Sequence, residues 1–186
     1  MTRLRYDRPV MKITALDFET ANYSEASICA AGIAVFVDGV LTDSRHWLVR
    51  PPEGHGWFRE DFIEIHRITH QDVAAAPEFS AVASELLPFL TDADLVVAHN
   101  APFDLGKLNG TLSHFGIPCP QFACVCSYRL SEKAWPDLPN HKLDTVAAHI
   151  GHRFHHHNAQ EDAEVAGYVL CTIIKERGQK WVMERV

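Results

Sequence analysis

Apolar residues in this chain form short runs that predict strands and periodic stretches that predict helices. The first three runs predict strands at 12–18, 28–37 and 40–49. The dipeptide Asp38-Gly39, between the second and third runs, strongly favours a tight hairpin turn. Residues 50–57 carry two prolines and two glycines, so we expect a loop there.

The rest of the chain alternates helical and strand patterns. Helical spacing predicts helices at 61–66, 77–90, 101–115, 142–150 and 159–176. Apolar runs predict a strand at 94–98 and a short strand at 122–127. A strand hairpin followed by alternating helices and strands is typical of an α/β fold with a mixed central sheet flanked by helices. We expect one domain at 12–180, preceded by a flexible extension at 1–11.

Length and composition fit one globular domain. The chain has 186 residues, of which 47% are hydrophobic and 22% charged. No apolar run approaches the roughly 20 residues that a membrane helix needs, so we expect no membrane association. The first residues lack the apolar segment of a secretory signal. The five cysteines are odd in number and lie mostly in apolar stretches, which favours reduced thiols and a cytoplasmic location.

The formal charge of −7 limits how the chain can bind nucleic acid. Proteins that hold long nucleic acids are usually basic, because their affinity comes from neutralising phosphates. An acidic chain argues against a long non-specific footprint. It is compatible with an enzyme that holds a few terminal nucleotides through metal ions.

Two acids close the first predicted strand. Because side chains alternate along a strand, Asp17 and Glu19 share one face, and Leu16 and Phe18 share the other. Two like charges beside an apolar run repel each other and lose solvation, so they need a cation or a shared proton. The simpler alternative is a strand end whose acids reach solvent.

A third acid follows the strand at 94–98. That strand leads directly into a helix, with Asn100 as a natural N-cap and Pro102 tolerated in the first turn. We expect His99 and Asn100 to organise this helix start. Asp104 then lies in the first turn, where an acid either interacts with the helix dipole or acts as a metal ligand.

The last acid lies at the start of the final long helix. Asn158 and Glu161 have the spacing of a capping box, which places Asp162 near the buried face of the helix and His157 just before it. A histidine with a pKa near 6.5 beside a metal ligand is suited to act as a general base. We expect the neighbouring His155 and His156 to form a solvated patch or an adventitious metal binder.

Together these segments resemble the three exonuclease motifs of the DEDD superfamily, in its histidine-bearing DEDDh branch. The resemblance covers about residues 12–175. The chain is similar to the proofreading epsilon subunit of bacterial DNA polymerase III. Of the three consecutive histidines, only His157 has the family's spacing to Asp162. Two positions depart from the family, which often has glycine where this chain has Asn22 and Arg67.

The resemblance implies a ribonuclease-H-like fold and a two-metal 3′–5′ exonuclease that releases 5′-mononucleotides from DNA, with RNA as an alternative substrate. It implies that two ions, Mg²⁺ or Mn²⁺, are held by four acids, Asp17, Glu19, Asp104 and Asp162. His157 would deprotonate the attacking water. The residues expected to bind the terminal nucleotide are Phe18, Thr20, His66 and Phe103, although core packing is an equal alternative for both phenylalanines.

The sequence allows several alternative functions. The exonuclease could act alone in DNA repair, serve as a proofreading subunit in DNA replication, or trim RNA. Single-stranded DNA 3′ ends are the first-choice partner, and a polymerase or a second copy of the chain is a further candidate. A binding module without catalysis should have lost a site residue, and all five are present. A metal-storage or sensor protein would use the 12 histidines instead.

Overall fold

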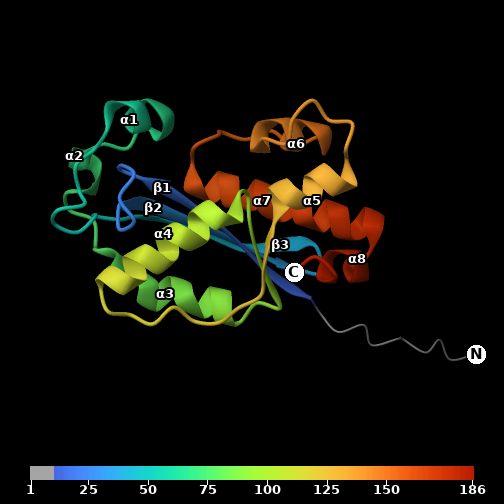
Figure 1. The fold of residues 1–186 in the computed structure, drawn as a ribbon, viewed down its shortest axis with the longest axis horizontal. Coiled ribbons are helices and arrows are strands. Elements are labelled where there is room, and N and C mark those ends of the chain that lie inside the picture. The colour runs from blue at the N-terminus through green and yellow to red at the C-terminus, as the bar shows by residue number, and fades with distance from the viewer. Residues whose placement is uncertain (1–10) are drawn as a thin grey trace, which may run out of the picture.

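A computed structural model describes residues 11–186 and shows one five-stranded mixed sheet (Figure 1). Its strands are β1 (Lys12–Thr20), β2 (Ile28–Val37), β3 (Val40–Leu48), β4 (Leu95–Ala98) and β5 (Cys124–Cys126). Their order across the sheet is β3-β2-β1-β4-β5. The pairs β1–β2 and β2–β3 are antiparallel, whereas β1–β4 and β4–β5 are parallel. The mixed sheet predicted from the sequence is therefore confirmed.

The β2–β3 hairpin turns at the predicted dipeptide. Asp38 and Gly39 have φ angles of 52° and 81°, the left-handed values that a two-residue turn of this type requires. The first strand runs two residues further than predicted and includes Glu19 and Thr20. A register irregularity lies between these two residues. The last two strands are shorter than predicted, because the flanking residues leave the sheet.

Helices cover both faces of the sheet (Figure 1). They are α1 (Glu60–His66), α2 (His70–Val73), α3 (Phe79–Thr91), α4 (Ala101–His114), α5 (Ser127–Ala134), α6 (Leu143–His149), α7 (Ala159–Arg177) and α8 (Gln179–Met183). One core lies between the sheet and α3 and α4, and includes Leu16, Phe18 and Phe79. The other lies between the sheet and α5 to α8, and includes Ile13 and Ala15. Adjacent residues of β1 thus enter opposite cores, as the alternation of a strand requires.

Three helices were not predicted, and the ordered region is longer than expected. The unpredicted helices α2, α5 and α8 have four, eight and five residues. Met11, assigned above to a flexible extension, is buried, and its N–H donates to Asp38 at 3.0 Å. Val182, beyond the predicted domain end, is also buried. Residues 1–10 lie outside the described part of the chain.

No helix among residues 11–186 has both the length and the apolar character to cross a bilayer. The fold instead concentrates polar groups at one end of the sheet. There, β1 ends beside α7, and the parallel strand β4 leads into α4. The carboxyl ends of neighbouring parallel strands are where open α/β sheets commonly bind ligands.

Candidate metal centre

Asp17 and Glu19 face the helix α7. They lie on the same side of β1 as Ile13 and Ala15, which belong to the core beneath that helix. Asp162, in the first turn of α7, reaches the same point. Carboxylate oxygens of the three acids all lie within 4.8 Å of one another. Two distant segments of the sequence are therefore brought together.

Asp104 reaches the site from α4. Its side chain is only 1% exposed, and Oδ1 accepts a hydrogen bond of 3.1 Å from the backbone N–H of Phe18. That N–H belongs to the residue between Asp17 and Glu19. Asp104 is close enough to Asp17 for its charge to raise the pKa of that residue. All four predicted acids thus belong to one electrostatic cluster.

Burial raises the pKa of every acid in this cluster. Burial is the main cause for Asp17, and the charges of Asp104, Asp162 and Glu19 add to it. Burial and the charge of Asp162 raise the pKa of Glu19 to about 8. Burial raises the pKa of Asp162 to about 7, against the opposing effect of the His157 N–H. The protein alone does not neutralise these acids, so the site favours protons or cations.

One oxygen of this cluster lacks a partner. Asp162 Oδ1 is buried and has no hydrogen-bond partner in the described part of the chain. An unpaired buried carboxylate oxygen is costly, and native structures usually satisfy such groups. Four carboxylates offer only oxygen ligands, which suit hard divalent cations. The residues present therefore fit a divalent metal centre.

The loop before α7 is held by backbone bonds to its first turn. His157 has a left-handed φ of 70°, and its N–H donates to Asp162 Oδ2 at 3.2 Å. The Asn158 side chain caps the helix, accepting bonds from the N–H groups of Gln160 and Glu161. The predicted capping box is incomplete, because Glu161 does not return a bond to Asn158. Its carboxylate accepts the N–H of His155 at 2.6 Å instead.

The consecutive histidines differ in environment. The His155 side chain is 93% exposed and pairs with Glu161 at 3.2 Å. His156 instead stacks on His157, with ring centroids 3.9 Å apart and an interplanar angle of 23°. His156 is exposed like His155, although its ring packs on that of His157. Burial, followed by the charges of His156 and His66, lowers the pKa of His157, which keeps its imidazole neutral at neutral pH.

His66 fixes the backbone next to the acids. Its Nδ1 accepts the N–H of Ile68 at 3.0 Å, so the neutral ring carries its proton on Nε2 and donates to the Thr20 carbonyl at 3.1 Å. Both ring nitrogens are thereby used within the protein. The preceding helix α1 ends at Arg67, whose φ of 65° is a value that glycine adopts more easily.

Of the two candidate phenylalanines, Phe18 lies in the core and Phe103 lies at the surface. Phe18 is 3% exposed and packs edge-on against Phe79 with centroids 6.0 Å apart. Its ring is therefore part of the core, and the predicted contact with substrate is not supported for this side chain. Phe103, in the first turn of α4, is 42% exposed. Its ring remains available for stacking. Thr20 is buried at the strand end.

Lys107 holds the loop that follows β1, a role that sequence reasoning missed. Its ammonium group donates to the carbonyls of Tyr23 at 3.0 Å and Ser24 at 2.7 Å, and more distantly to that of Asn22 at 3.5 Å. It also lies 5.6 Å from the centre of the Phe103 ring. The signal in the sequence is a lysine three residues after Asp104, on the buried face of α4.

Asn22 supports the same loop through its side chain. Its amide donates to the carbonyls of His55 at 2.8 Å and Trp57 at 2.6 Å, and its oxygen accepts the N–H of Ser24 at 2.7 Å. Asn22 is not among the residues with positive φ, so its backbone does not need the conformational freedom of glycine. The departure from the family pattern is thus compensated by three side-chain bonds.

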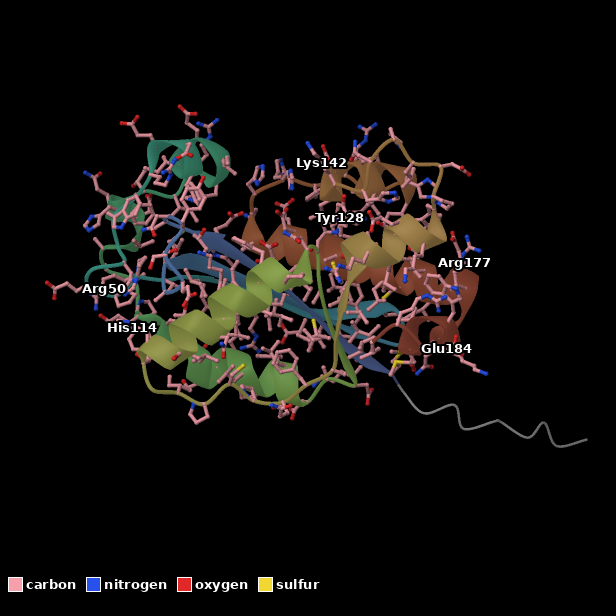
Figure 2. All side chains as sticks on the ribbon, in the orientation of Figure 1. Arg50, His114, Tyr128, Lys142, Arg177 and Glu184 are labelled. Carbon is pink, nitrogen blue, oxygen red and sulfur yellow. The ribbon has the colours of Figure 1, made fainter. Side chains whose placement is uncertain are left out.

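His99 links β4 to α5 rather than capping α4. Its ring nitrogens lie 3.0 Å from Ser127 Oγ and 2.9 Å from the His141 carbonyl. Tyr128 packs edge-on against His99 with centroids 5.6 Å apart. Figure 2 shows Tyr128 on the same side of the molecule as Lys142, away from Arg177 and Glu184. Asn100 occupies the N-cap position with φ of 68°, but its side chain makes no capping bond.

The start of α7 rests on β2 and β3. A Cβ built on Gly32 would lie 2.0 Å from the Ala159 carbonyl oxygen and 2.4 Å from the backbone nitrogen of Gln160. Only glycine leaves room for the helix at this point. The Gln160 amide also donates to Ser44 Oγ at 2.9 Å. These contacts fix the helix turn that carries Asp162.

The chain matches a family model and several known proteins. Residues 14–170 match the family model RNase_T, described as exonuclease. A PolC-type DNA polymerase III of Halalkalibacterium halodurans is 31% identical over 122 residues, which are 65% of this chain and 8% of that protein. The PolC-type enzyme of Lacticaseibacillus paracasei is 34% identical over 122 residues, with the same shares. The chain thus spans under a tenth of the length of these relatives.

Solved structures resemble the fold along nearly the whole chain. Exonuclease X, in complex with 5′ overhanging duplex DNA, has a TM-score of 0.73 at 22% identity, covering 93% of this chain and 96% of its own. The nuclease domain of 3′hExo, a DEDDh family member bound to rAMP, has a TM-score of 0.75 at 16% identity. The alignment covers 91% of this chain and 94% of that domain.

Proposed function

The chain belongs to the RNase_T exonuclease family, and on this premise we propose that it hydrolyses the terminal phosphodiester bond at DNA 3′ ends and releases 5′-mononucleotides. The observation that carries the proposal is the convergence of four acids and His157 at one end of the sheet. The predicted exonuclease family is confirmed by the family match, and the predicted fold is confirmed by the likeness to solved structures.

Asp17, Glu19, Asp104 and Asp162 would hold the divalent cations, for which we propose two Mg²⁺ or Mn²⁺ ions. When bound, such a pair stabilises the attacking and leaving oxygens of an in-line displacement. The support is the donor set itself: only carboxylate oxygens, raised pKa values, and one buried oxygen without a partner.

His157 acts as the general base in this proposal. Its lowered pKa leaves the ring neutral, so a ring nitrogen can accept the proton of the attacking water. The left-handed backbone and the bond from its N–H to Asp162 fix the residue beside the acids. Proton acceptance and cation binding would thus take place on adjacent residues of the same loop and helix start.

The terminal nucleotide would lie between β1 and the first turn of α4. Phe103 is the exposed aromatic ring there, and aromatic rings stack on bases without reading sequence. Thr20 and His66 would act by fixing the backbone at the edge of this site, since the Thr20 carbonyl is held by the His66 ring. We propose single-stranded DNA as the preferred substrate, because its terminal bases are free to stack.

Two other uses of the same active site remain candidates. Relatives that match part of this chain are PolC-type DNA polymerases, which supports a proofreading role beside a polymerase as a second candidate. RNA trimming is the other, since a neighbouring structure is bound to rAMP. A homodimer is a further candidate assembly. All five cysteines are free thiols, and on this ground we propose a cytoplasmic location.

A labelled-oligonucleotide assay tests the proposal. The full chain is incubated with 5′-labelled single-stranded DNA, duplex DNA and RNA, with Mg²⁺, with Mn²⁺ or with EDTA. We expect a ladder that shortens from the 3′ end of single-stranded DNA, and no reaction in EDTA. Asp17→Asn should abolish cleavage, whereas Asp43→Asn, at an exposed acid on β3 paired with Arg45, should not. Equal activity of Asp17→Asn and the unmodified chain would exclude the assigned site.

A further inference from the structure

A groove of about 600 Å³ lies at the β5 edge of the sheet. It is lined by β5, by Ala101 and Pro102 at the start of α4, and by one face of α5. Figure 1 shows the starts of α4 and α5 side by side. The charged residues that line the groove are three cations and one acid, namely Arg129, Lys133, Arg185 and Glu132. The groove thus has an excess of positive charge on a chain whose formal charge is −7.

The groove adjoins the acid cluster. Ala101 and Pro102, which line it, precede Phe103 and Asp104 in the first turn of α4. Cys124 lines it from β5, and burial, followed by the charge of Asp104, raises the pKa of its thiol to about 12. The thiol therefore lies within electrostatic reach of that acid. A nucleic acid strand whose 3′ end lies at the acids can extend into the groove along the same surface.

Two cations of the groove are not neutralised by an acid. Arg129 and Lys133 are exposed, and neither forms an ion pair within the described part of the chain. By contrast, Arg59 is held by Asp61 at 2.8 Å. Arg129 and Lys133 are four positions apart on α5 and therefore share a face, on which like charges repel each other. An anion bound between them would remove this repulsion.

Arg185 brings a third cation to the groove from the segment after α8. Its guanidinium carbon lies 4.0 Å from the centre of the Trp181 ring, and the group donates to the Trp181 carbonyl at 2.6 Å. The side chain is therefore held in place. Glu184 lies 3.8 Å away, which is too far for a hydrogen bond. The planar donor fork of an arginine matches the oxygens of a phosphate.

Phosphates fit this groove better than an acidic peptide does. A peptide would bind a sheet edge by adding a strand, and β5, with only three residues, offers few backbone bonds for this. Phosphates require the positive charges alone. The groove is also lined by Leu105 and Leu130, against which sugars and bases can pack.

We propose that this groove binds the phosphodiester backbone of the substrate strand upstream of its 3′-terminal nucleotide. The proposal rests on the proposed function, because the bound strand is the one whose end lies at the acids. Arg129, Lys133 and Arg185 hold its phosphates. Local positive charge thus offsets the acidity of the chain as a whole. The enzyme favours strands long enough to reach the groove, and their binding weakens as salt rises.

Fluorescence anisotropy of labelled oligothymidylate, with the full chain in EDTA, measures this binding without catalysis. Arg129→Gln should weaken binding about fivefold at about 0.1 M salt, and should reduce the slope of log affinity against log salt by about 0.7. Arg129→Lys keeps the charge and should keep the slope. The control is Lys175→Gln, which removes the same charge from an exposed lysine that lines a different cavity. Equal losses for Arg129→Gln and Lys175→Gln, or no loss for either, would exclude the groove.

The oligonucleotide assay shows where along the substrate the groove acts. A dinucleotide has only the scissile phosphate, which lies at the acids, so Arg129→Gln should leave its kcat/KM unchanged. On a longer single strand, the KM of this variant should rise about fivefold while kcat stays the same. Equal losses on both substrates would show that Arg129 acts at the scissile bond, and the proposal would be wrong.

Polyglutamate is the probe for the other occupant. If Arg129→Gln loses affinity for polyglutamate but not for oligothymidylate, the groove binds acidic peptides and the proposal is wrong. It is also wrong if the loss is confined to blunt duplex DNA. A chain that binds oligothymidylate through the groove but cleaves no nucleic acid would contradict the proposed function, whereas the anisotropy would still decide whether the groove binds a nucleic acid strand.

Discussion

The backbone N–H of Phe18 donates a 3.1 Å hydrogen bond to Asp104, a residue 86 positions further along the chain. The bond joins α4 to the strand residue that lies between two other acids of the site. Its geometry explains how acids from different elements keep a common position although they repel one another. The role of Asp104 in the fold can be tested apart from its charge, because the amide oxygen of an asparagine in its place can accept the same bond.

Asp104→Asn should therefore keep the fold and lose the nuclease activity. The amide oxygen preserves the bond to Phe18, while one negative charge leaves a cluster of buried acids. In EDTA, the melting temperature should equal or exceed that of the unmodified chain, because repulsion falls. The stabilisation on adding Mg²⁺ should shrink. A lower melting temperature in EDTA would show that the charge itself supports the fold.

The metal-free protein should become less stable as the pH rises from about 7 to 8. Burial raises the pKa of Glu19 to about 8 and that of Asp162 to about 7. Both acids therefore bind more protons in the folded than in the unfolded chain, so the free energy of unfolding falls with pH in this window. Urea unfolding in EDTA at both pH values measures the change, and Mg²⁺ should reduce it.

His99 acts in the opposite direction to the acids below about pH 6.5. Burial lowers the pKa of His99 to about 4, so the unfolded chain binds the additional proton. Stability contributed by neutral His99 is present above its unfolded pKa and is lost as the pH falls toward 4. The raised pKa values of Glu19 and Asp162 still favour the folded chain in this window, so His99 offsets part of their contribution as the pH falls. A monotonic rise in stability from pH 6.5 to 8 would contradict the raised pKa values of the acids.

Arg67→Gly should stabilise the protein by about 0.5–1 kcal/mol. Arg67 ends α1 with a left-handed φ of 65°, which a side chain disfavours and glycine accepts. The net gain is the free energy released when the left-handed conformation no longer strains a side chain, less the entropic cost of folding a glycine. Urea unfolding measures it, and Arg67→Ala is the control that should show no gain. Equal effects of both variants would assign the change to the lost arginine side chain.

Lys107→Met should destabilise the protein by about 2 kcal/mol, because hydrogen bonds from a charged donor are lost and buried carbonyls remain without a partner. The loop after β1 would also loosen, so kcat/KM should fall. Lys175→Met, at an exposed lysine of α7, is the matched control. If the two variants have the same unfolding free energy, the loop is held by its other bonds.

Gly32→Ala should abolish activity while changing no residue of the acid cluster. The added methyl would collide with the backbone of Ala159 and Gln160, which cannot give way as a flexible side chain can. The first turn of α7 must then move, and Asp162 moves with it. Activity and metal-induced stabilisation should be lost together. Gly106→Ala, where nothing lies within 4 Å of the added atom, is the control.

Patterns of apolar residues predicted most of the fold. Long apolar runs such as 28–37 predicted strands correctly, and helix-start patterns placed Asp104 in a first turn and Asp162 near a buried helix face. The short helix α2 was missed, because four residues show no period. Its capping box, formed by Thr69 and Asp72, was the available signal.

The sequence could not predict how the rings of His156 and His157 lie, because their positions depend on the backbone conformation at His157. His156 and His157 are adjacent, and alternation would send their rings apart. The left-handed φ of His157 brings them into a stack instead. Phe18 illustrates the opposite case, since the alternation that directs Asp17 and Glu19 to α7 also directs Phe18 into the core. The resemblance to a family suggested a substrate contact that this strand geometry disfavours.

The close packing of Gly32 against Ala159 has a consequence for when the enzyme becomes active. These residues are far apart along the chain, so their contact can form only after the last long helix has been synthesised. Before that moment, the emerging polypeptide carries Asp17, Glu19 and Asp104 but neither Asp162 nor the base. A ribosome-bound or truncated chain would therefore be harmless to nucleic acid, and destructive chemistry would start only with a finished fold.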